Sequence, residues 1–297
     1  MREEVRILSP AKINLHLAIK KKREDGYHEI LSLFQMVSLY DEITIRSLKS
    51  KDECFIDGRF DFPKEQNLMY KAVQLLWSVT GMRRGVHIKA LKRIPEGAGL
   101  GGGSSNGASV LVALNELWET RFTSLEISTL SKALGSDVPF FCVTPAAIVT
   151  GRGEMICPVN PRDDYHIVLV YPGFKVRAKD AYDLFDRAIP WKLRKSVQEI
   201  PGDIIEIKYI KESPQKWNFF NSFKDVLEQE YPVLGALVEK LRSLGAEYAN
   251  ISGSGSSVFG IFLTKKQAEK AVRELQIGCN SLWILFPLDR KPEAILQ

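Results

Sequence analysis

Residues 95–106 read Pro-Glu-Gly-Ala-Gly-Leu-Gly-Gly-Gly-Ser-Ser-Asn. The glycines permit positive φ angles and remove the Cβ atoms that would hold a bulky anion away from the backbone. Apolar residues then recur at helical spacing over 108–118, so the loop opens into an amphipathic helix with Ser104 and Ser105 at its capping position. The unpaired N–H groups and the positive dipole end of such a helix suit a phosphate. The stretch therefore predicts a phosphate-binding loop.

Other kinds of loop share part of this pattern. A flexible linker is rarely followed at once by a buried helix, which disfavours a linker. Gly97, Gly99 and Gly102 have the G-x-G-x-x-G spacing of a dinucleotide site, but that fold needs a second strand after the helix. Here Thr123-Ser124-Leu125-Glu126 is a capping box that starts another helix. The sequence also lacks the G-x-x-x-x-G-K-[ST] pattern of a Walker-type loop.

Composition sets broad limits on the kind of protein. The 297 residues suffice for one large or two modest domains, and the mild net charge of +5 favours anionic small molecules without requiring nucleic acid. Cys54, Cys142, Cys157 and Cys279 lack metal-ligand spacing and are interpreted as buried, reduced thiols. No signal-peptide core, transit peptide or membrane-spanning run is apparent, so we expect a bacterial cytoplasmic protein without a membrane partner. The oligomeric state stays open.

The segment before the loop has the alternation of strands. Apolar side chains alternate over 13–19, which predicts a strand with one buried face. Lys12, Asn14 and His16 then share the other face, where a lysine is by itself most often only solvated. Further elements expected in this half are strands over 34–45 and 86–90 and a helix after Asn67.

Two short motifs stand at the expected starts of elements. Asp25-Gly26 predicts a turn that presents Tyr27 and His28 side by side, and taken alone this motif favours a tyrosine packed on the turn and a histidine bonded to backbone. Asp137 precedes Val138-Pro139 and is expected to cap a helix. A carboxylate at a helix start is also rigidly positioned for chemistry.

The second half predicts a separate unit. Polar residues and proline accumulate over 160–164, so 1–159 and 160–297 are expected to form two domains. The expected order strand-helix-strand-strand-helix-strand is that of a split βαβ layer. Small residues over 252–257 lie between its middle strands, and two such loops in two halves predict a cleft where they meet.

Several motifs, in order and at suitable spacing, resemble the GHMP kinase family. They are Pro10-Ala11-Lys12-Ile13-Asn14-Leu15, Asp25-Gly26-Tyr27-His28, the glycine loop, Gly135-Ser136-Asp137-Val138-Pro139-Phe140-Phe141 and Ser252-Gly253-Ser254-Gly255. The resemblance implies a two-domain α+β GHMP kinase fold. Its N-terminal domain would be like ribosomal protein S5, its C-terminal domain ferredoxin-like, and its active site would lie in the cleft between them.

The Asp-Gly-Tyr-His and Gly-Ser-Asp-Val-Pro motifs resemble one branch of this family. That branch uses ATP to phosphorylate the 2-hydroxyl of 4-diphosphocytidyl-2-C-methyl-D-erythritol, in the non-mevalonate route to isoprenoid precursors. Two other functions are kept as alternatives: another small-molecule kinase of the family, and an RNA-binding protein that uses the S5-like layer. Exposed aromatics interleaved with basic residues are not evident, which disfavours RNA binding.

The resemblance also implies roles for particular residues. Lys12 and Asp137 match the catalytic pair, in which the carboxylate orients or deprotonates the hydroxyl and the cation keeps the carboxylate ionised and meets charge on the transferring group. The acceptor positions are Asn14 for the methylerythritol hydroxyls and Tyr27, His28 and Tyr182 for the cytosine. The positions that would wrap the ATP phosphates are Pro95, Glu96, Gly97, Ala98, Gly99, Leu100, Gly101, Gly102, Gly103, Ser104 and Ser105.

The implied cofactors are ATP, as co-substrate, and Mg²⁺ between its phosphates. Ser104 or Ser105 is expected near the ion or a phosphate, and no protein metal site is predicted. One segment departs from the family: Asn221-Ser222-Phe223-Lys224 stands where Asn-Asp-Phe-Glu is common. Both acids are absent, so this segment is given no catalytic role.

Overall fold

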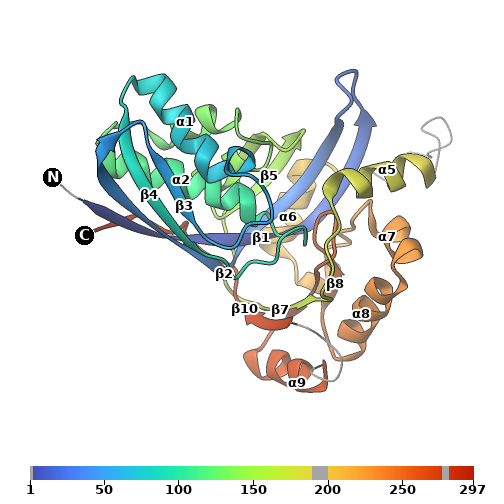
Figure 1. Ribbon diagram of the computed structural model, residues 1–297. Coiled ribbons are helices and arrows are strands. Elements are labelled where there is room, and N and C mark those ends of the chain that lie inside the picture. Colours follow the sequence, from blue (N-terminus) through green and yellow to red (C-terminus); the bar gives the residue numbers. More distant parts are fainter. Residues whose placement is uncertain (1–2, 189–199, 276–280) are drawn as a thin grey trace.

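The computed structural model describes residues 3–188, 200–275 and 281–297, which form two β-sheets with helices packed against them (Figure 1). The larger sheet contains β1 (Glu4–Lys22), β2 (His28–Lys51), β3 (Cys54–Asp57), β4 (Arg84–Leu91), β5 (Ala146–Gly151), β6 (Met155–Pro158) and β11 (Ile295–Leu296). The smaller sheet contains β7 (His166–Tyr171), β8 (Tyr248–Ile251), β9 (Val258–Phe262) and β10 (Ser281–Leu285). The described helices are α1 (Leu68–Thr80), α2 (Gly102–Trp118), α3 (Ser124–Ser131), α4 (Val138–Val143), α5 (Ala178–Ala188), α6 (Gly202–Lys211), α7 (Lys224–Glu230), α8 (Pro232–Ser243) and α9 (Lys265–Leu275). This content confirms the α+β prediction.

The first strand buries both of its faces over residues 9–19. β1 and β2 pair as a long antiparallel ribbon whose hairpin end reaches toward α5 (Figure 1). The sequence predicted one buried face over 13–19, yet Lys12, Asn14 and His16 are only 4%, 3% and 0% exposed. Their face is covered by the second half of the chain, for example where the Asn14 N–H donates to Ser252 Oγ. The single-face prediction is therefore wrong, because alternation reports only the apolar face.

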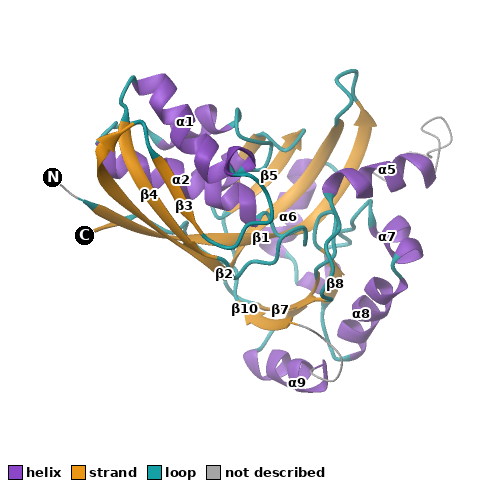
Figure 2. Cartoon of the chain, viewed as in Figure 1, coloured by secondary structure: helices purple, strands orange, loops and turns teal. Residues whose placement is uncertain are grey.

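Two helices that pack on the larger sheet begin at different kinds of cap. α1 follows Asn67, whose Oδ1 accepts the Met69 N–H as predicted. α2 begins at Gly102, with Gly101 at the N-cap and a φ of 69°. The predicted capping by Ser104 and Ser105 is wrong, because both lie inside the first turn of the helix. In Figure 2 these helices lie on the same side of the larger sheet.

The smaller sheet confirms the split βαβ prediction. Its order is β10-β7-β9-β8 and every pair is antiparallel. Helix α9 follows Thr264, which exchanges capping bonds with Gln267 as in a capping box. Helix α6 lies in the stretch 189–221 that the sequence left uninterpreted, and residues 189–199 lie outside the described part.

A core of apolar side chains joins the two sheets. Ile13 and Leu15 of β1 pack in one cluster with Ile167 and Leu169 of β7 and with Trp217. Strand β11 returns to pair with β1, so the two ends of the chain lie close together (Figure 1). The division at 159/160 stays a prediction.

The described cysteines fit the prediction in part. Cys54 and Cys142 are buried, and burial raises the pKa of each thiol to about 11. Cys157 is exposed instead, because β6 pairs only with β5 and forms an edge of the sheet. Cys279 lies outside the described residues. Within the described ranges, none of the helices has the length and apolar character needed to cross a bilayer.

Candidate active site

A cavity of about 710 Å³ opens between the two halves of the chain. Its lining includes Lys12 and Asp137 from the first half, Tyr182 and Gly253 from the second, and Gly101 of the glycine loop. The predicted cleft therefore exists, and it gathers motifs that are far apart in the sequence.

Lys12 and Asp137 meet in this cavity. Lys12 Nζ lies 3.6 Å from Asp137 Oδ2 and donates a 2.6 Å hydrogen bond to Asn14 Oδ1. Asp137 occupies the N-cap position of α4, but its side chain makes no capping bond. The predicted cap is wrong in that respect, because the carboxylate is turned toward the lysine. With a side chain 30% exposed, it is open to a ligand in the cavity.

The environment of Lys12 disfavours its charge. Burial lowers the pKa of the Lys12 ammonium from its ordinary 10.5, and the Asp137 carboxylate opposes that effect. The ammonium also lies 4.5 Å from the centre of the Phe34 ring, whose π face attracts a cation. Lys12 is thus a desolvated cation, and such a group gains most from a bound anion.

Asn14 supports the lysine more directly than it faces a ligand. Its Oδ1 accepts from Lys12, and its Nδ2 donates to Ser32 Oγ at 3.0 Å. Gly253 packs against it: a Cβ there would lie 3.0 Å from Asn14 Oδ1. The predicted contact of Asn14 with substrate hydroxyls stays a prediction, while its observed bonds position Lys12.

Hydrogen bonds to its carbonyl groups hold the glycine loop in place. Lys12, Val176 and Ser257 donate backbone N–H bonds to the carbonyls of Leu100, Gly97 and Ala98. The carbonyl of Gly99 accepts a hydrogen bond from Ser252 Oγ at 2.9 Å. Both halves of the chain therefore bind the carbonyl side of the loop. Ala98 and Leu100 are each only 1% exposed, so little of either residue is open to a ligand.

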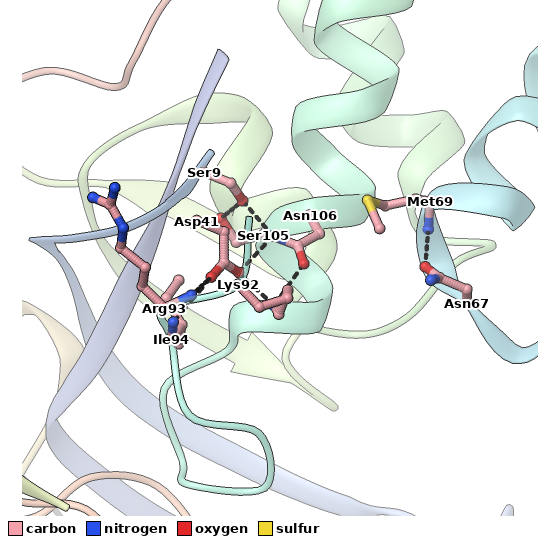
Figure 3. A network of polar contacts seen from close by, with 9 residues as sticks. All are labelled: Ser9, Asp41, Asn67, Met69, Lys92, Arg93, Ile94, Ser105 and Asn106. Atoms are coloured by element: carbon pink, nitrogen blue, oxygen red, sulfur yellow. Dashed lines mark hydrogen bonds and ion pairs between the residues drawn. The ribbon is translucent and has the colours of Figure 1, made fainter. Parts of the chain in front are cut away.

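A buried carboxylate fixes both flanks of this loop (Figure 3). Asp41 is 0% exposed and accepts bonds from the N–H groups of Arg93 and Ile94 at 2.7 and 2.9 Å, ahead of the loop. It also accepts from Asn106 Nδ2 at 2.9 Å, beyond the loop, and from Lys92 Nζ. The loop is therefore clamped at entry and exit.

The two serines of the loop face different ways. Ser105 is fully buried, and its Oγ bonds to Ser9 Oγ at 2.7 Å (Figure 3). Ser104 lines the cavity instead. Of the two serines predicted near a phosphate or Mg²⁺, the structure thus leaves Ser104 in position.

A second pocket of about 330 Å³ lies on the other side of the loop. It is lined by the aromatic residues Phe60 and Phe62, by Asn67, and by Pro95 and Glu96 of the loop. Gly97, Gly101 and Ser104 line both pockets, so the glycine loop separates them. The sequence analysis missed this pocket because Phe60 and Phe62 lie in a variable, charged stretch without a readable motif.

The far end of the main cavity carries the aromatic groups. His28 stacks on Tyr182, with ring centroids 4.6 Å apart and planes at 12°, and its Nε2 bonds Asp186 Oδ1 at 2.9 Å. Tyr27 is separate from this stack and 54% exposed. Its ring faces the Arg152 guanidinium at 4.8 Å. Sequence reasoning missed Asp186 and Arg152, since neither belongs to a motif.

Two titratable groups at this end are perturbed. Although burial opposes it, hydrogen bonds from Lys22 and His28 hold the pKa of Asp186 below its usual value. Burial, helped by the Asp137 charge, raises the pKa of Tyr182, so its hydroxyl stays protonated. The segment at Asn221 is structural here: its Nδ2 donates to the carbonyls of Ile251 and Gly253.

Comparison with known proteins identifies the family. The model described as "GHMP kinases N terminal domain" matches residues 67–144, and "GHMP kinases C terminal" matches 208–281. A protein of Thermodesulfovibrio yellowstonii named 4-diphosphocytidyl-2-C-methyl-D-erythritol kinase is 37% identical over 89% of this chain and 91% of its own length. The chain belongs to this family of GHMP kinases. A protein of the same name from Syntrophus aciditrophicus is 35% identical over 95% of the chain and 98% of its own length.

Solved structures agree with this kinase assignment. A crystal structure of a 4-(cytidine 5'-diphospho)-2C-methyl-D-erythritol kinase is similar at a TM-score of 0.79 and 32% identity, over 95% of this chain and 98% of that one. The homoserine kinase of Cytophaga hutchinsonii matches at a TM-score of 0.77 but at 16% identity, over 99% and 98% of the two chains. The second match shows the fold alone. This chain is therefore a kinase with the two-domain fold that the sequence predicted.

Proposed function

We propose that this kinase transfers the γ-phosphoryl group of ATP to the 2-hydroxyl of 4-diphosphocytidyl-2-C-methyl-D-erythritol, in the non-mevalonate route to isoprenoid precursors. One observation carries the proposal: the Lys12–Asp137 pair lies in a cavity that is lined by the glycine loop as well as by Tyr27 and His28. A phosphoryl donor and a cytidine-linked acceptor can thus meet at a carboxylate.

ATP fits the two pockets that share the glycine loop. Its phosphates are placed along the loop, whose carbonyls are occupied and whose helix N-terminus favours negative charge. The adenine is placed in the second pocket, where Phe60 and Phe62 offer apolar, aromatic contacts. The γ-phosphate then enters the main cavity past Ser104, which lines both pockets.

Asp137 acts on the acceptor hydroxyl. Its carboxylate accepts the hydroxyl hydrogen bond, orients the oxygen for attack and takes the proton as the bond to the γ-phosphorus forms and the bond from that phosphorus to the departing ADP breaks. Lys12 meets the negative charge on the transferring group, and its desolvation strengthens that interaction. Asn14 holds the ammonium in place for both partners.

Mg²⁺ fits the oxygen donors of this site. We place the ion between the phosphates of ATP, where phosphate and water oxygens supply most of its ligands. Ser104 and Asp137 are the residues of the cavity that would complete its coordination. The ion supplies neutralisation of phosphate charge.

The acceptor is placed with its base at the aromatic end. Tyr27 offers an exposed ring for stacking, and the His28–Tyr182 stack provides an aromatic wall and a polar edge. Because a stacking face accepts any base, edge contacts must select the cytosine. This placement leaves the methylerythritol near Asp137.

The proposal also includes a bacterial cytoplasmic location for the protein and a division of the chain into two domains at 159/160.

The test is ATP-dependent phosphorylation by the purified protein. 4-Diphosphocytidyl-2-C-methyl-D-erythritol is offered together with 2-C-methyl-D-erythritol 4-phosphate, mevalonate and homoserine as competing acceptors. We expect turnover of the cytidylylated compound alone, with inhibition by CDP that is competitive against it. Turnover of another acceptor would contradict the substrate assignment while leaving the kinase assignment intact, and would favour the alternative of a different small-molecule kinase.

A further inference from the structure

The turn between β5 and β6 brings an arginine to the edge of the cavity. Its sequence is Gly151-Arg152-Gly153-Glu154, and two hydrogen bonds donated by its backbone N–H groups hold its shape. The Arg152 N–H donates to Glu154 Oε2 at 2.7 Å, and the Gly153 N–H to Thr150 O at 3.1 Å. Neither bond uses the guanidinium, so the side chain can be changed without loss of these contacts.

Arg152 spans the two ends of the acceptor site. The neighbouring Gly153 lies against the catalytic carboxylate, since a Cβ there would be 3.1 Å from Asp137 Oδ1. The guanidinium at the tip of the Arg152 side chain lies 4.8 Å from the centre of the Tyr27 ring. A substrate whose base is at Tyr27 and whose hydroxyl is at Asp137 must carry its diphosphate through the space between them.

The charge of Arg152 is also available to an anion. The described cations that line the cavity are Lys12, Lys22, Arg152 and Lys179. The first two form ion pairs with Asp137 and Asp186, and Lys179 is exposed in the first turn of α5. No carboxylate in the described ranges forms a direct ion pair with Arg152, although Asp25 is near enough for the arginine charge to help lower its pKa. A guanidinium without such a pair can bind phosphate oxygens with two parallel N–H bonds.

We propose that Arg152 binds the diphosphate of the cytidine-linked acceptor and makes the site prefer a cytidine diphosphate over cytidine. The inference rests on the proposed function and adds a specificity residue to it. Packing against Tyr27 restricts the arginine before the substrate arrives, so less side-chain entropy is lost on binding.

Isothermal calorimetry with cytidine, CMP and CDP tests this without catalysis. The proteins are the wild type, Arg152→Gln, Arg152→Lys and the control Lys21→Gln. Lys21 is 71% exposed, lies in β1 beside the turn that carries Tyr27, and is outside the cavity lining, so its variant removes one nearby charge without touching the site. We expect Arg152→Gln to weaken CDP binding by about ten- to a hundredfold, as for loss of a charged hydrogen bond, with cytidine changed less than about twofold. Arg152→Lys should recover part of the loss, and the control should bind as the wild type does.

Three results would overturn the proposal. Equal losses for cytidine and CDP would show that Arg152 only supports Tyr27. A raised KM for ATP with unchanged CDP affinity would assign the cation to the nucleotide phosphates. A wild-type protein that binds none of the three ligands, yet phosphorylates another acceptor, would end the proposed function as well; because this appears in the wild type alone, the two failures are distinguishable.

Discussion

The two ends of the cavity are held in place by different parts of the chain, one by backbone groups and the other by side chains. The glycine loop is fixed by backbone: carbonyls 97–100 all accept bonds, and the buried Asp41 holds both flanks. The aromatic end is fixed by side chains, with Tyr27 more than half exposed and Asp186 bonded to a hairpin residue. A backbone cradle binds phosphates whatever they are attached to, whereas exchangeable side chains can select an acceptor. The similar fold of homoserine kinase at 16% identity fits this division, because the fold does not choose the acceptor.

Removing Asp41 should produce the largest loss of stability. Asp41→Ala removes the only ion-pair partner, among the described residues, of the Lys92 ammonium, which is 12% exposed and keeps Asn106 Oδ1 as an acceptor, and it leaves two backbone N–H groups without theirs. We expect the free energy of unfolding to fall by about 3–5 kcal/mol in urea denaturation. Asp186→Ala is the matched change at the other end, where the carboxylate is 19% exposed, and should lower it by about 1 kcal/mol or less. Equal losses would remove the contrast between the two ends.

Substitutions of two glycines of the loop distinguish a position that the fold requires from a position that ligand binding requires. Gly99 has a φ of +75°, and a Cβ there would lie 1.9 Å from Ser252 O, so Gly99→Ala should destabilise the fold by about 1–3 kcal/mol from backbone strain alone. Gly103 lies in the first turn of α2, and a Cβ there would project into open space, with no neighbouring group within 4 Å. Gly103→Ala should therefore stabilise the helix by about 0.5–1 kcal/mol and still raise the KM for ATP. Unchanged ATP affinity in Gly103→Ala would show that no phosphate lies there.

The pH dependence should report the buried lysine. Burial lowers the pKa of Lys12 below 10.5, and its protonated form is the active one. The kcat/KM for ATP should therefore fall as pH rises through that lowered pKa, at a pH below 10.5. In Lys12→Arg the guanidinium keeps its charge, so the residual activity should lose this alkaline fall. If the wild type and Lys12→Arg showed the same alkaline fall, the fall would belong to a group other than Lys12.

The smallest expected effect concerns a hydroxyl at the aromatic end. Tyr182 contributes its ring to the stack with His28. Tyr182→Phe keeps the ring and should change cytidine affinity by less than about twofold, whereas Tyr182→Ala should weaken it by about two- to tenfold, as for loss of an aromatic contact. Calorimetry measures both. Wild-type affinity in Tyr182→Ala would show that the ring is not part of the base site.

The same contrast explains what the sequence could predict. The glycine loop can be recognised in the sequence because a backbone that needs conformational freedom at several nearby positions requires glycine there. Asp41 could not be found in this way, since its partners lie at 92–94 and 106 and a single aspartate has no spacing to read. Alternation over 13–19 located the strand but missed the burial of Lys12, because only folding brings the second half onto that face.

The helix starts show a similar limit. Asp137 has the residue type and position of a cap, and the structure places it at the N-cap. Its side chain instead turns to Lys12, a residue more than a hundred positions away in the sequence. Arg152 belongs to no motif of the sequence, and only the fold brings it over Tyr27. Local patterns therefore located these elements, while the partners of their side chains depended on tertiary structure.

The central claim is that Asp137 acts on a cytidine-linked hydroxyl inside this cavity. A single-turnover measurement with 4-diphosphocytidyl-2-C-methyl-D-erythritol and ATP, comparing the wild type with Asp137→Asn, tests it most directly. The substitution keeps the size of the side chain and removes no capping bond, so folding and ATP affinity should be retained. We predict a phosphoryl-transfer rate lower by about 10²–10⁴-fold. A rate close to that of the wild type would contradict the account.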